Sequence, residues 1–385
     1  MTSLKESSMD QHSFTIMQCW APRLRRAIFK THSQTRQLFA IVIPFVISVS
    51  ALAQEQNWIV PQETNVDASF RGLAVVDQDE AWVSGSKGVV IRTVDRGATW
   101  SRIRIPKTDE LDFRDVALPE KNIVLLMSAG AGDKSQVFRS IDSGKSWTNV
   151  LINQDDDGFF NAFTFFDSQN GILIGDPING RLDVYRTSDG GTTWMREQGP
   201  AFQDGEYGFA ASGTNVTTVA PNHVWIASGG SIARVFRLSD SQKTWMSSET
   251  PMAQGNDSSG IFSVAFRDPF HGVIVGGDYK NPESDNGNIA HTADGGKTWT
   301  LANPKGKVSH KACVRHIGEK RWISVGRTGV AISDDDGATW KQVSDQGYFT
   351  FDVNGETFTG WMAGSDGRVA RFTWPQAPMS HRSKQ

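Results

Sequence analysis

The sequence predicts an all-β fold, a single seven-bladed β-propeller of four-stranded blades, and three features support this. The pattern Ser/Thr-x-Asp-x-Gly-x-Ser/Thr-Trp, which we call the Asp box, recurs along the chain. Its tryptophans, with Trp374 in a vestigial last copy, are 47, 47, 51, 54, 41 and 34 residues apart. A period of about 40–50 residues is typical of propeller blades. Between the boxes lie short runs rich in β-branched and aromatic residues, separated by Gly and Asp turns, as expected of strands.

Each repeat predicts four strands. In the third repeat these are residues 161–166, 171–175 and 182–186 and a fourth strand that starts near Trp194. The first strands begin near Arg71, Arg114, Asn161, Asn215, Phe262, Ala312 and Thr350, and the second strands end near Gly85, Gly130, Gly175, Gly229, Gly276, Gly326 and Gly364.

The seventh repeat stops one strand short, after Phe372. Residues 57–61 resemble the fourth-strand sequence 99–103 of the first repeat. We therefore expect the N-terminal stretch to complete blade seven, which closes the ring and leaves no open sheet edge.

The Asp boxes have an expected structural role. Their aspartates are Asp95, Asp142, Asp189, Asp240, Asp294 and Asp335, and in the degraded fourth copy Gln242 replaces the glycine. The carboxylate can accept backbone N–H groups within the turn between the third and fourth strands. The glycine permits a positive φ, and the tryptophan fills the space between blades and can satisfy its indole N–H there. The alternative is that these aspartates bind a metal or catalyse a reaction.

Residues 1–53 predict a secretory signal peptide. A basic region with Arg23, Arg25, Arg26, Lys30 and Arg36 precedes the apolar stretch 38–53, which ends in Ala-Leu-Ala. Sixteen residues interrupted by a proline and a serine fall short of the ~20 needed to span a bilayer. We expect cleavage and export to the periplasm or the outside, with no membrane span afterwards; the alternative is a retained anchor. The expected domains are a signal peptide at 1–53, the propeller at 54–375 and a disordered tail at 376–385.

Charge and cysteine content exclude several classes of partner and site. Without residues 1–53 the chain has 33 basic and 40 acidic residues, a net charge of −7, which argues against a nucleic-acid partner. Only Cys313 remains, so no internal disulfide is expected, and its apolar surroundings predict a buried, inert thiol. The eight histidines show no metal-ligand spacing and no phosphate-binding glycine loop leads into a helix, so we expect no metal and no cofactor. We also expect a monomer.

The repeated Asp box resembles the BNR/Asp-box propeller superfamily, whose members include sialidases, xyloglucanase-type glycosidases, sortilin-type receptors and photosystem II stability/assembly factors. Seven short blades, an export signal and repeats such as Gly-Ile-Leu-Ile-Gly followed by Tyr-Arg-Thr-Ser-Asp-Gly-Gly-Thr-Thr-Trp make residues 57–375 look most like the assembly factors. The resemblance implies a non-catalytic scaffold that uses an arginine patch to contact a membrane-protein client. Arg71 and Arg114 match such a patch, and the alternative is that both are solvated surface residues.

Propeller topology predicts where a ligand would bind. Strands alternate in direction, so the links between blades and between second and third strands share one face, opposite the Asp boxes. The channel mouth on that face is the default place for a protein or carbohydrate ligand. The candidate binding residues there are Arg71, Arg114, Asp176, Glu206, Tyr207, Asp278, Tyr279, His310 and Arg327.

Three carboxylates suggest an alternative, enzymatic function. Asp176 and Asp278 follow glycines at the same point of blades three and five, and Glu206 enters between them. We expect all three to converge on one sector of the mouth, where they could act as the catalytic acids of a sialidase- or xyloglucanase-like glycoside hydrolase, whose carboxylates lie about 5–10 Å apart. The other interpretations are that they bind a ligand or that Asp176 and Asp278 only cap turns. A sialidase would also need an Arg-Ile-Pro motif ahead of the first box, whereas Arg104 and its neighbours lie after it.

Overall fold

The computed structural model describes residues 58–238, 244–355 and 357–374. The chain divides into two units, 1–54 and 55–385, and all described residues belong to the second. The predicted signal peptide at 1–53, the predicted tail at 376–385 and Asp240 of the fourth Asp box lie outside the described residues.

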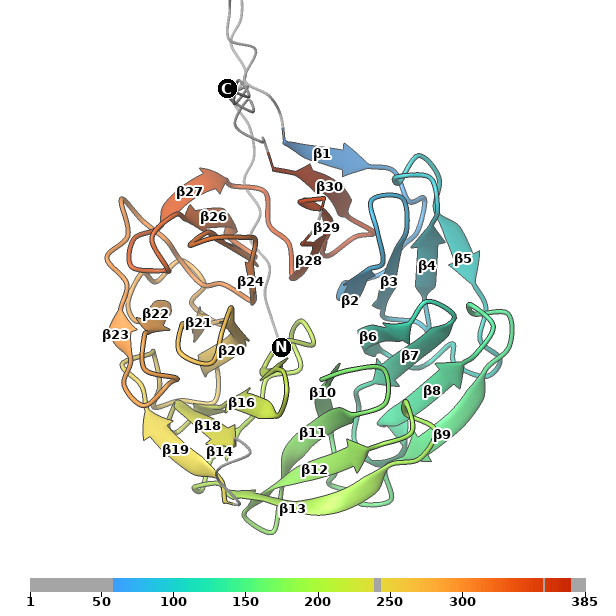
Figure 1. The fold of residues 1–385 in the computed structure, drawn as a ribbon, viewed down its shortest axis with the longest axis horizontal. Helices are drawn as coiled ribbons and strands as arrows, with labels where there is room; N and C mark the ends of the chain where they lie inside the picture. Colours follow the sequence, from blue (N-terminus) through green and yellow to red (C-terminus); the bar gives the residue numbers. More distant parts are fainter. Residues whose placement is uncertain (1–57, 239–243, 356, 375–385) are drawn as a thin grey trace, which may run out of the picture. The chain divides into compact units, whose positions relative to one another are not determined.

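Seven antiparallel sheets form the blades of a propeller, which confirms the predicted fold (Figure 1). Blade one comprises β2 (Phe70–Val75), β3 (Ala81–Gly85), β4 (Val90–Thr93) and β5 (Ser101–Ile103). Blade two comprises β6 (Phe113–Glu120), β7 (Ile123–Ser128), β8 (Gln136–Ser140) and β9 (Thr148–Ile152). Blade three comprises β10 (Phe160–Phe165), β11 (Gly171–Ile178), β12 (Arg181–Thr187) and β13 (Met195–Ala201). A 3-10 turn, η1 (Gly132–Lys134), lies between β7 and β8.

The later blades follow the same order. Blade four comprises β15 (Val216–Val219), β16 (His223–Ala227), β18 (Arg234–Leu238) and β19 (Met246–Glu249). Blade five comprises β20 (Ser259–Phe266), β21 (Gly272–Asp278), β22 (Ile289–Thr292) and β23 (Thr300–Leu301). Blade six comprises β24 (Cys313–His316), β25 (Trp322–Gly326), β26 (Gly329–Ser333) and β27 (Lys341–Ser344). Blade seven has β28 (Thr350–Asn354), β29 (Thr359–Ala363) and β30 (Val369–Thr373).

The N-terminal strand closes the ring as predicted. Strand β1 (Ile59–Gln62) pairs antiparallel with β30, with Ile59 opposite Phe372 and Gln62 opposite Val369. Blade seven therefore contains strands from both ends of the described chain. Since pairing satisfies the edge of β30, the propeller is held shut by main-chain hydrogen bonds.

The first strand of each blade lies nearest the centre, as Figure 1 shows for β2, β6, β10, β24 and β28. Because successive strands are antiparallel, the starts of the first strands and the turns between second and third strands lie on one face. The Asp boxes, between third and fourth strands, lie on the other. This arrangement puts the channel mouth and the Asp boxes on opposite faces.

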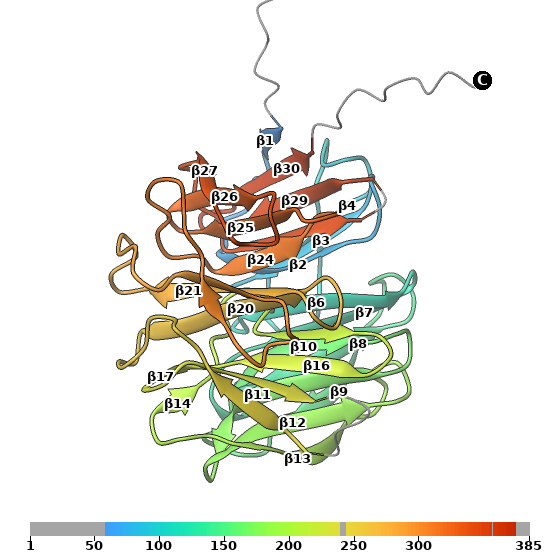
Figure 2. The same cartoon turned by 60° about the vertical axis from the view of Figure 1, so that its left-hand side comes forward.

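Blade five departs from the repeat. Its sheet gains two short strands, β14 (Glu206–Tyr207) and β17 (Gly229–Gly230), which come from the connections around blade four. Glu206 pairs with Gly230, and Gly229 pairs with Gly260 of β20. Figure 2 shows β14 and β17 together at the left-hand edge of the turned propeller. The chain between blades three and four is thus fixed onto blade five.

The Asp-box tryptophans pack between neighbouring blades. Trp340 is 1% exposed and donates its indole N–H to the carbonyl of Gly337 at 2.9 Å, and Trp147 makes the same bond to Gly144 at 3.1 Å. The indole nitrogens of Trp100, Trp194 and Trp299 have no hydrogen-bond partner in the described part of the chain. Hydrophobic packing rather than the indole bond is therefore what the described boxes share.

Candidate functional site

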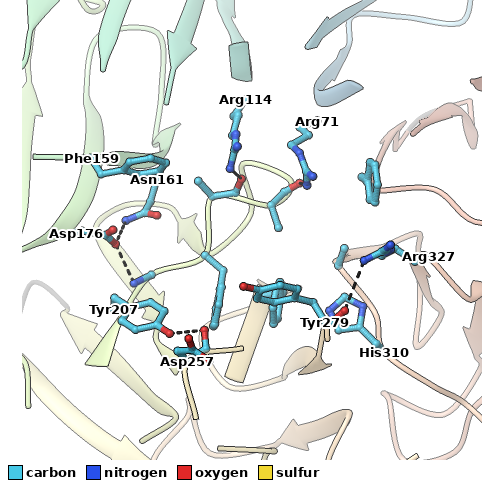
Figure 3. A pocket seen from close by; sticks show the side chains of 17 residues that line it. Arg71, Arg114, Phe159, Asn161, Asp176, Tyr207, Asp257, Tyr279, His310 and Arg327 are labelled. Atoms are coloured by element: carbon cyan, nitrogen blue, oxygen red, sulfur yellow. Dashed lines mark hydrogen bonds between the residues drawn. The ribbon is translucent and has the colours of Figure 1, made fainter. Parts of the chain in front are cut away.

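A cavity of about 580 Å³ lies at the channel mouth. This volume falls within the roughly 300–1,000 Å³ typical of sites for small ligands. Its wall draws on six blades and on the connection that leads into blade four; the lining residues are Arg71, Arg114, Phe159, Asn161, Asp176, Tyr207, Gly208, Phe209, Ala210, Ala211, Asp257, Phe262, Tyr279, His310, Ala312, Arg327 and Phe349. Figure 3 shows these side chains around the opening.

Residues 208–211 line this pocket and, with Ser212, form one segment of the chain that is held from several blades. Arg71 donates from Nη1 to the carbonyl of Ala211 at 3.2 Å, and Arg114 donates to that of Ala210 at 3.0 Å. On the far side, the Ser212 hydroxyl donates to the carbonyl of Ala312 at 2.8 Å. The segment thus spans the mouth from blades one and two to blade six.

Three arginines give one side of the pocket a positive charge. The Arg71 guanidinium lies 4.4 Å from the ring of Phe349, a cation–π contact. Burial, with Arg114 and Arg327 nearby, lowers the pKa of Arg71 to about 10, although Asp112 opposes the shift. Arg114 pairs with Asp112 at 2.9 Å, whereas exposed Arg327 makes one long bond, at 3.5 Å, to the carbonyl of Tyr279. The positive charge here is only partly compensated.

His310 adds an unused polar group on the same side. Its side chain is 2% exposed and its ring meets Phe262 edge-on, with centroids 4.7 Å apart. Neither ring nitrogen has a hydrogen-bond partner among the described residues. Burial, reinforced by Lys311 and Arg327 and opposed by Asp278, lowers the pKa of His310 to about 4. The imidazole is therefore neutral at neutral pH, with a free donor and a free acceptor.

The opposite side of the pocket carries acceptors. The Asp176 carboxylate accepts hydrogen bonds from Asn161 Nδ2 at 2.8 Å and from the Gly208 backbone at 3.2 Å. Burial raises the pKa of Asp176, and these two bonds partly oppose the rise. Asn161 is 1% exposed, and its Oδ1 has no partner within the described residues. Figure 3 shows Asn161 and Asp176 side by side on this side of the pocket.

An aromatic cluster lines the pocket and runs from Tyr207 near Asp176 to Tyr279 near His310 (Figure 3). Phe209 stacks on Phe262 with centroids 4.0 Å apart, and Tyr207 and Tyr279 meet Phe209 edge-on at 5.5 and 6.4 Å. The Tyr207 hydroxyl donates to the carbonyl of Asp257. Burial, followed by the nearby charge of Asp257, raises the pKa of Tyr207 to about 12, so the phenol stays neutral.

The three carboxylates expected to converge do not meet in the pocket. Asp176 lines it, but Glu206 and Asp278 do not. Glu206 is buried and held by Arg234, by Ser228 and by the backbone N–H of Gln203. These bonds anchor the connection before blade four, so the carboxylate is already fully engaged.

Asp278 ends β21 and caps the following turn, where its Oδ1 accepts the Lys280 backbone N–H at 2.9 Å. Burial acts to raise the pKa of Asp278, but hydrogen bonds from Ser258, Lys280 and Asn281 and the charge of Lys280 lower it overall. Of the alternatives open for this residue, the structure supports turn capping.

Seven of the nine predicted binding residues line the pocket: Arg71, Arg114, Asp176, Tyr207, Tyr279, His310 and Arg327. Sequence reasoning did not single out Phe159, Asn161, Phe209, Asp257, Phe262 and Phe349 as functional. One signal could have pointed to two of them, since Phe159 and Phe349 each stand directly before a first strand.

No group of three or more His, Cys, Asp or Glu side chains in the described part of the chain is placed to hold a metal ion. No helix within the same residues is long and apolar enough to cross a membrane.

Comparisons with known proteins agree with this architecture. The family model of the photosynthesis system II assembly factor YCF48 matches residues 50–201. A structure of YCF48 bound to a D1 peptide superimposes with a TM-score of 0.60 at 14% identity, covering 83% of this chain and 98% of that chain. YCF48 from Cyanidioschyzon merolae gives 0.58 at 17% identity, covering 82% and 98%.

A GH74 xyloglucanase from Xanthomonas campestris gives a TM-score of 0.53 at 16% identity, covering 73% of this chain and 48% of that chain. At such low identities these likenesses show the fold alone. No curated protein matches the sequence.

Proposed function

We propose that this BNR-type propeller, which is similar to the photosystem II assembly factor YCF48, is a non-catalytic scaffold that binds a segment of a partner protein in the pocket at its channel mouth. The observation that carries the proposal is the set of unused polar groups in a preformed cavity: the ring nitrogens of His310, Oδ1 of Asn161 and the weakly engaged Arg327. Since buried polar groups in proteins are normally hydrogen-bonded, a ligand that satisfies them would gain affinity.

The solved relative supports a protein ligand. YCF48 has been determined with a D1 peptide bound, so a propeller of this fold can hold a peptide. Export is part of the proposal and rests on the basic region and apolar stretch of residues 1–53. The exported chain would act as a monomer.

The second candidate function is a glycoside hydrolase acting at the same mouth, on a carbohydrate rather than a protein. It is favoured only by Asp176, a buried carboxylic acid with a raised pKa on the pocket wall. A glycosidase of the usual kind needs a second carboxylate about 5–10 Å away. Glu206 is paired with Arg234, and the other carboxylate of the wall, Asp257, is paired with Lys280 at 3.0 Å. The pairing of both partners makes the scaffold the better supported function.

Site-directed photo-crosslinking in the native cell tests the scaffold. A photoreactive residue at Tyr279, which is 37% exposed at the pocket rim, should crosslink one partner protein that mass spectrometry identifies. Arg327→Glu should abolish the crosslink, because it reverses the least compensated charge of the pocket. Arg102→Glu, on exposed β5 away from the mouth, is the matched control and should leave the crosslink unchanged.

Two results would count against the scaffold. The first is that crosslinking from Tyr279 is insensitive to Arg327→Glu while a purified sample keeps its native melting temperature. The second is turnover of aryl-glycosides by the purified propeller that Asp176→Asn abolishes. The latter result would favour the hydrolase.

A further inference from the structure

We infer that the pocket selects a peptide segment that presents an ammonium group to one end of the cavity and a carboxylate to the other. This inference rests on the proposed function, because it specifies the chemistry of the segment that the scaffold holds. It goes beyond an arginine patch, since it assigns the acceptor side of the pocket an equal part in recognition.

The acceptor end of the pocket suits a ligand group that donates hydrogen bonds. Asp176 and Asn161 lie together at the left of Figure 3, linked by their 2.8 Å hydrogen bond. That bond uses Asn161 Nδ2 as the donor, so Asn161 Oδ1 points away from Asp176 with no partner in the described chain. Both known bonds to Asp176 are made to Oδ1, which leaves Oδ2 available. An ammonium group carries three donors and no acceptor, so it fits a carboxylate and an amide oxygen.

The donor end of the pocket suits an anionic ligand group. Arg327 and His310 lie at the right of Figure 3, and Arg71 and Arg114 lie along the top. The proximity of Arg114 and Arg327 to Arg71 is unfavourable in the empty pocket, because both destabilise the charged form of Arg71. A carboxylate placed among them would relieve this repulsion and could accept from the guanidinium groups, which suit planar carboxylates. The free N–H of His310 is a further donor on this side.

The aromatic cluster suits an apolar spacer between the two charges. Phe209 and Phe262 form a stacked pair, flanked by Tyr207 and Tyr279. Aromatic faces bury an apolar side chain and tolerate an ammonium group above them.

A simple anion fits the pocket less well. It would satisfy the arginines but leave Oδ1 of Asn161 and the carboxylate of Asp176 facing a ligand without donors. An unpaired acceptor and a like charge both lower affinity, so the two ends together discriminate against phosphate or a purely acidic peptide.

Short peptides with a central phenylalanine provide the probes. Free Ala-Phe-Ala carries its two charges at the chain ends, and Lys-Phe-Glu with acetylated and amidated ends carries them on side chains. Each is compared with derivatives in which the ammonium or the carboxylate has been neutralised. Inorganic phosphate serves as the anion control. Titration calorimetry with the purified propeller at low salt measures affinity, because salt screens exposed charges.

We expect at least one of the two zwitterionic peptides to bind, and the better of them identifies the source of the charges. Neutralising either charge should weaken that peptide by about tenfold or more, the loss expected for one charged hydrogen bond. In Asp176→Asn, which keeps an acceptor for Asn161 and Gly208, removing the ammonium should no longer matter. Arg327→Gln should reduce the loss of affinity on neutralising the carboxylate, because Arg71 and Arg114 remain. Unchanged melting temperatures would show that both variants fold.

The inference would be overturned if binding required the carboxylate but was unchanged when the ammonium group was acetylated. It would also be overturned if phosphate bound as tightly as the peptide. Failure of both zwitterionic peptides at millimolar concentration would also overturn it. Each of these results leaves the crosslinked partner of the proposed function untouched. Conversely, zwitterion binding without any protein crosslink would sustain the pocket chemistry and remove the protein partner.

Discussion

The Asp-box turns and the pocket at the channel mouth belong to the same blades, yet the turns satisfy their aspartate carboxylates, whereas the pocket leaves polar side-chain atoms unpaired. In the turn at Asp335, Oδ1 accepts from the Thr339 backbone at 2.8 Å and from the Ser333 hydroxyl at 2.9 Å, and Oδ2 accepts from the Thr339 hydroxyl at 2.7 Å. The boxes of Asp95, Asp142, Asp189 and Asp294 repeat these bonds. At the mouth, by contrast, His310 and Asn161 keep buried polar atoms without partners among the described residues.

The difference agrees with the proposed function, in which the Asp boxes contribute to stability and the pocket binds the partner. A turn that satisfies its own carboxylate can be repeated wherever a third strand must reverse into a fourth. A pocket needs side chains whose bonding capacity is left for a ligand, so its residues depart from the repeat.

The largest effect should come from an Asp-box tryptophan. Trp340 is 1% exposed and packs in the cluster formed between blades five and six. Trp340→Ala should lower the free energy of unfolding by about 3–5 kcal/mol, because it removes a large buried side chain and leaves a cavity. Thermal or denaturant unfolding of the two proteins measures the loss.

Trp100→Ala is the matched control, since Trp100 is only partly buried and its indole nitrogen has no partner within the described residues. It should cost clearly less than Trp340→Ala. Equal losses would mean that the depth of burial does not set the contribution of each box.

The fold could be predicted from sequence because the signal was periodic. The strand pattern and the Trp spacing fixed seven blades, and the likeness of residues 57–61 to a fourth strand located the closing strand β1. The repeat period could not predict β14 and β17, because these strands form by pairing between connections rather than within a repeat.

The candidate site was predictable only in part. Position in the blade placed Arg71, Arg114 and Asp176 at the mouth, because topology alone determines which face a strand end reaches. It could not show that Glu206 is held by Arg234, twenty-eight positions along the chain and in another strand. Nor could it show that residues 208–212 cross the mouth, since that depends on side-chain bonds from blades one, two and six.

The next effect concerns the pH dependence of stability at the mouth. The pKa of His310 falls from 6.5 to about 4 on folding, mainly through burial, so the folded state favours the neutral ring. For a base with a lowered folded pKa, the contribution to stability is fully present above pH 6.5 and is lost as pH falls toward 4. The loss at full protonation is on the order of 3 kcal/mol.

His310→Gln tests this value, because glutamine does not titrate. The substitution has some cost in unfolding free energy at pH 7.5. As pH falls from 6.5 to 4, the parent protein should lose more unfolding free energy than the variant, so the difference between the two should move in favour of the variant. A constant difference across that range would show that His310 titrates normally and is solvated. The groups that face it, Lys311, Arg327 and Asp278, are unchanged in the variant and so cancel from the comparison.

The smallest effect concerns the pH dependence of stability at the Asp boxes, on the face opposite the mouth. Hydrogen bonds from Ser146 and Ser140 lower the pKa of Asp142 to about 2. At Asp294 burial acts to raise the pKa, but the bonds from Thr298 and Thr292 lower it to about 2. An acid with a lowered folded pKa stabilises the protein above its unfolded pKa of about 3.9 and loses that contribution as pH falls toward 2.

Asp142→Asn and Asp294→Asn should therefore each destabilise the protein modestly at pH 7 and flatten the decline in melting temperature between pH 4 and 2. The effect is small because the solvent screens these exposed turns. It also acts in a different pH range from that of His310, so the two faces can be separated in one titration. If the declines of the parent and the Asn variants stay parallel below pH 4, the box carboxylates are not the ions that hold the turns, and the contrast with the mouth would then rest on packing alone.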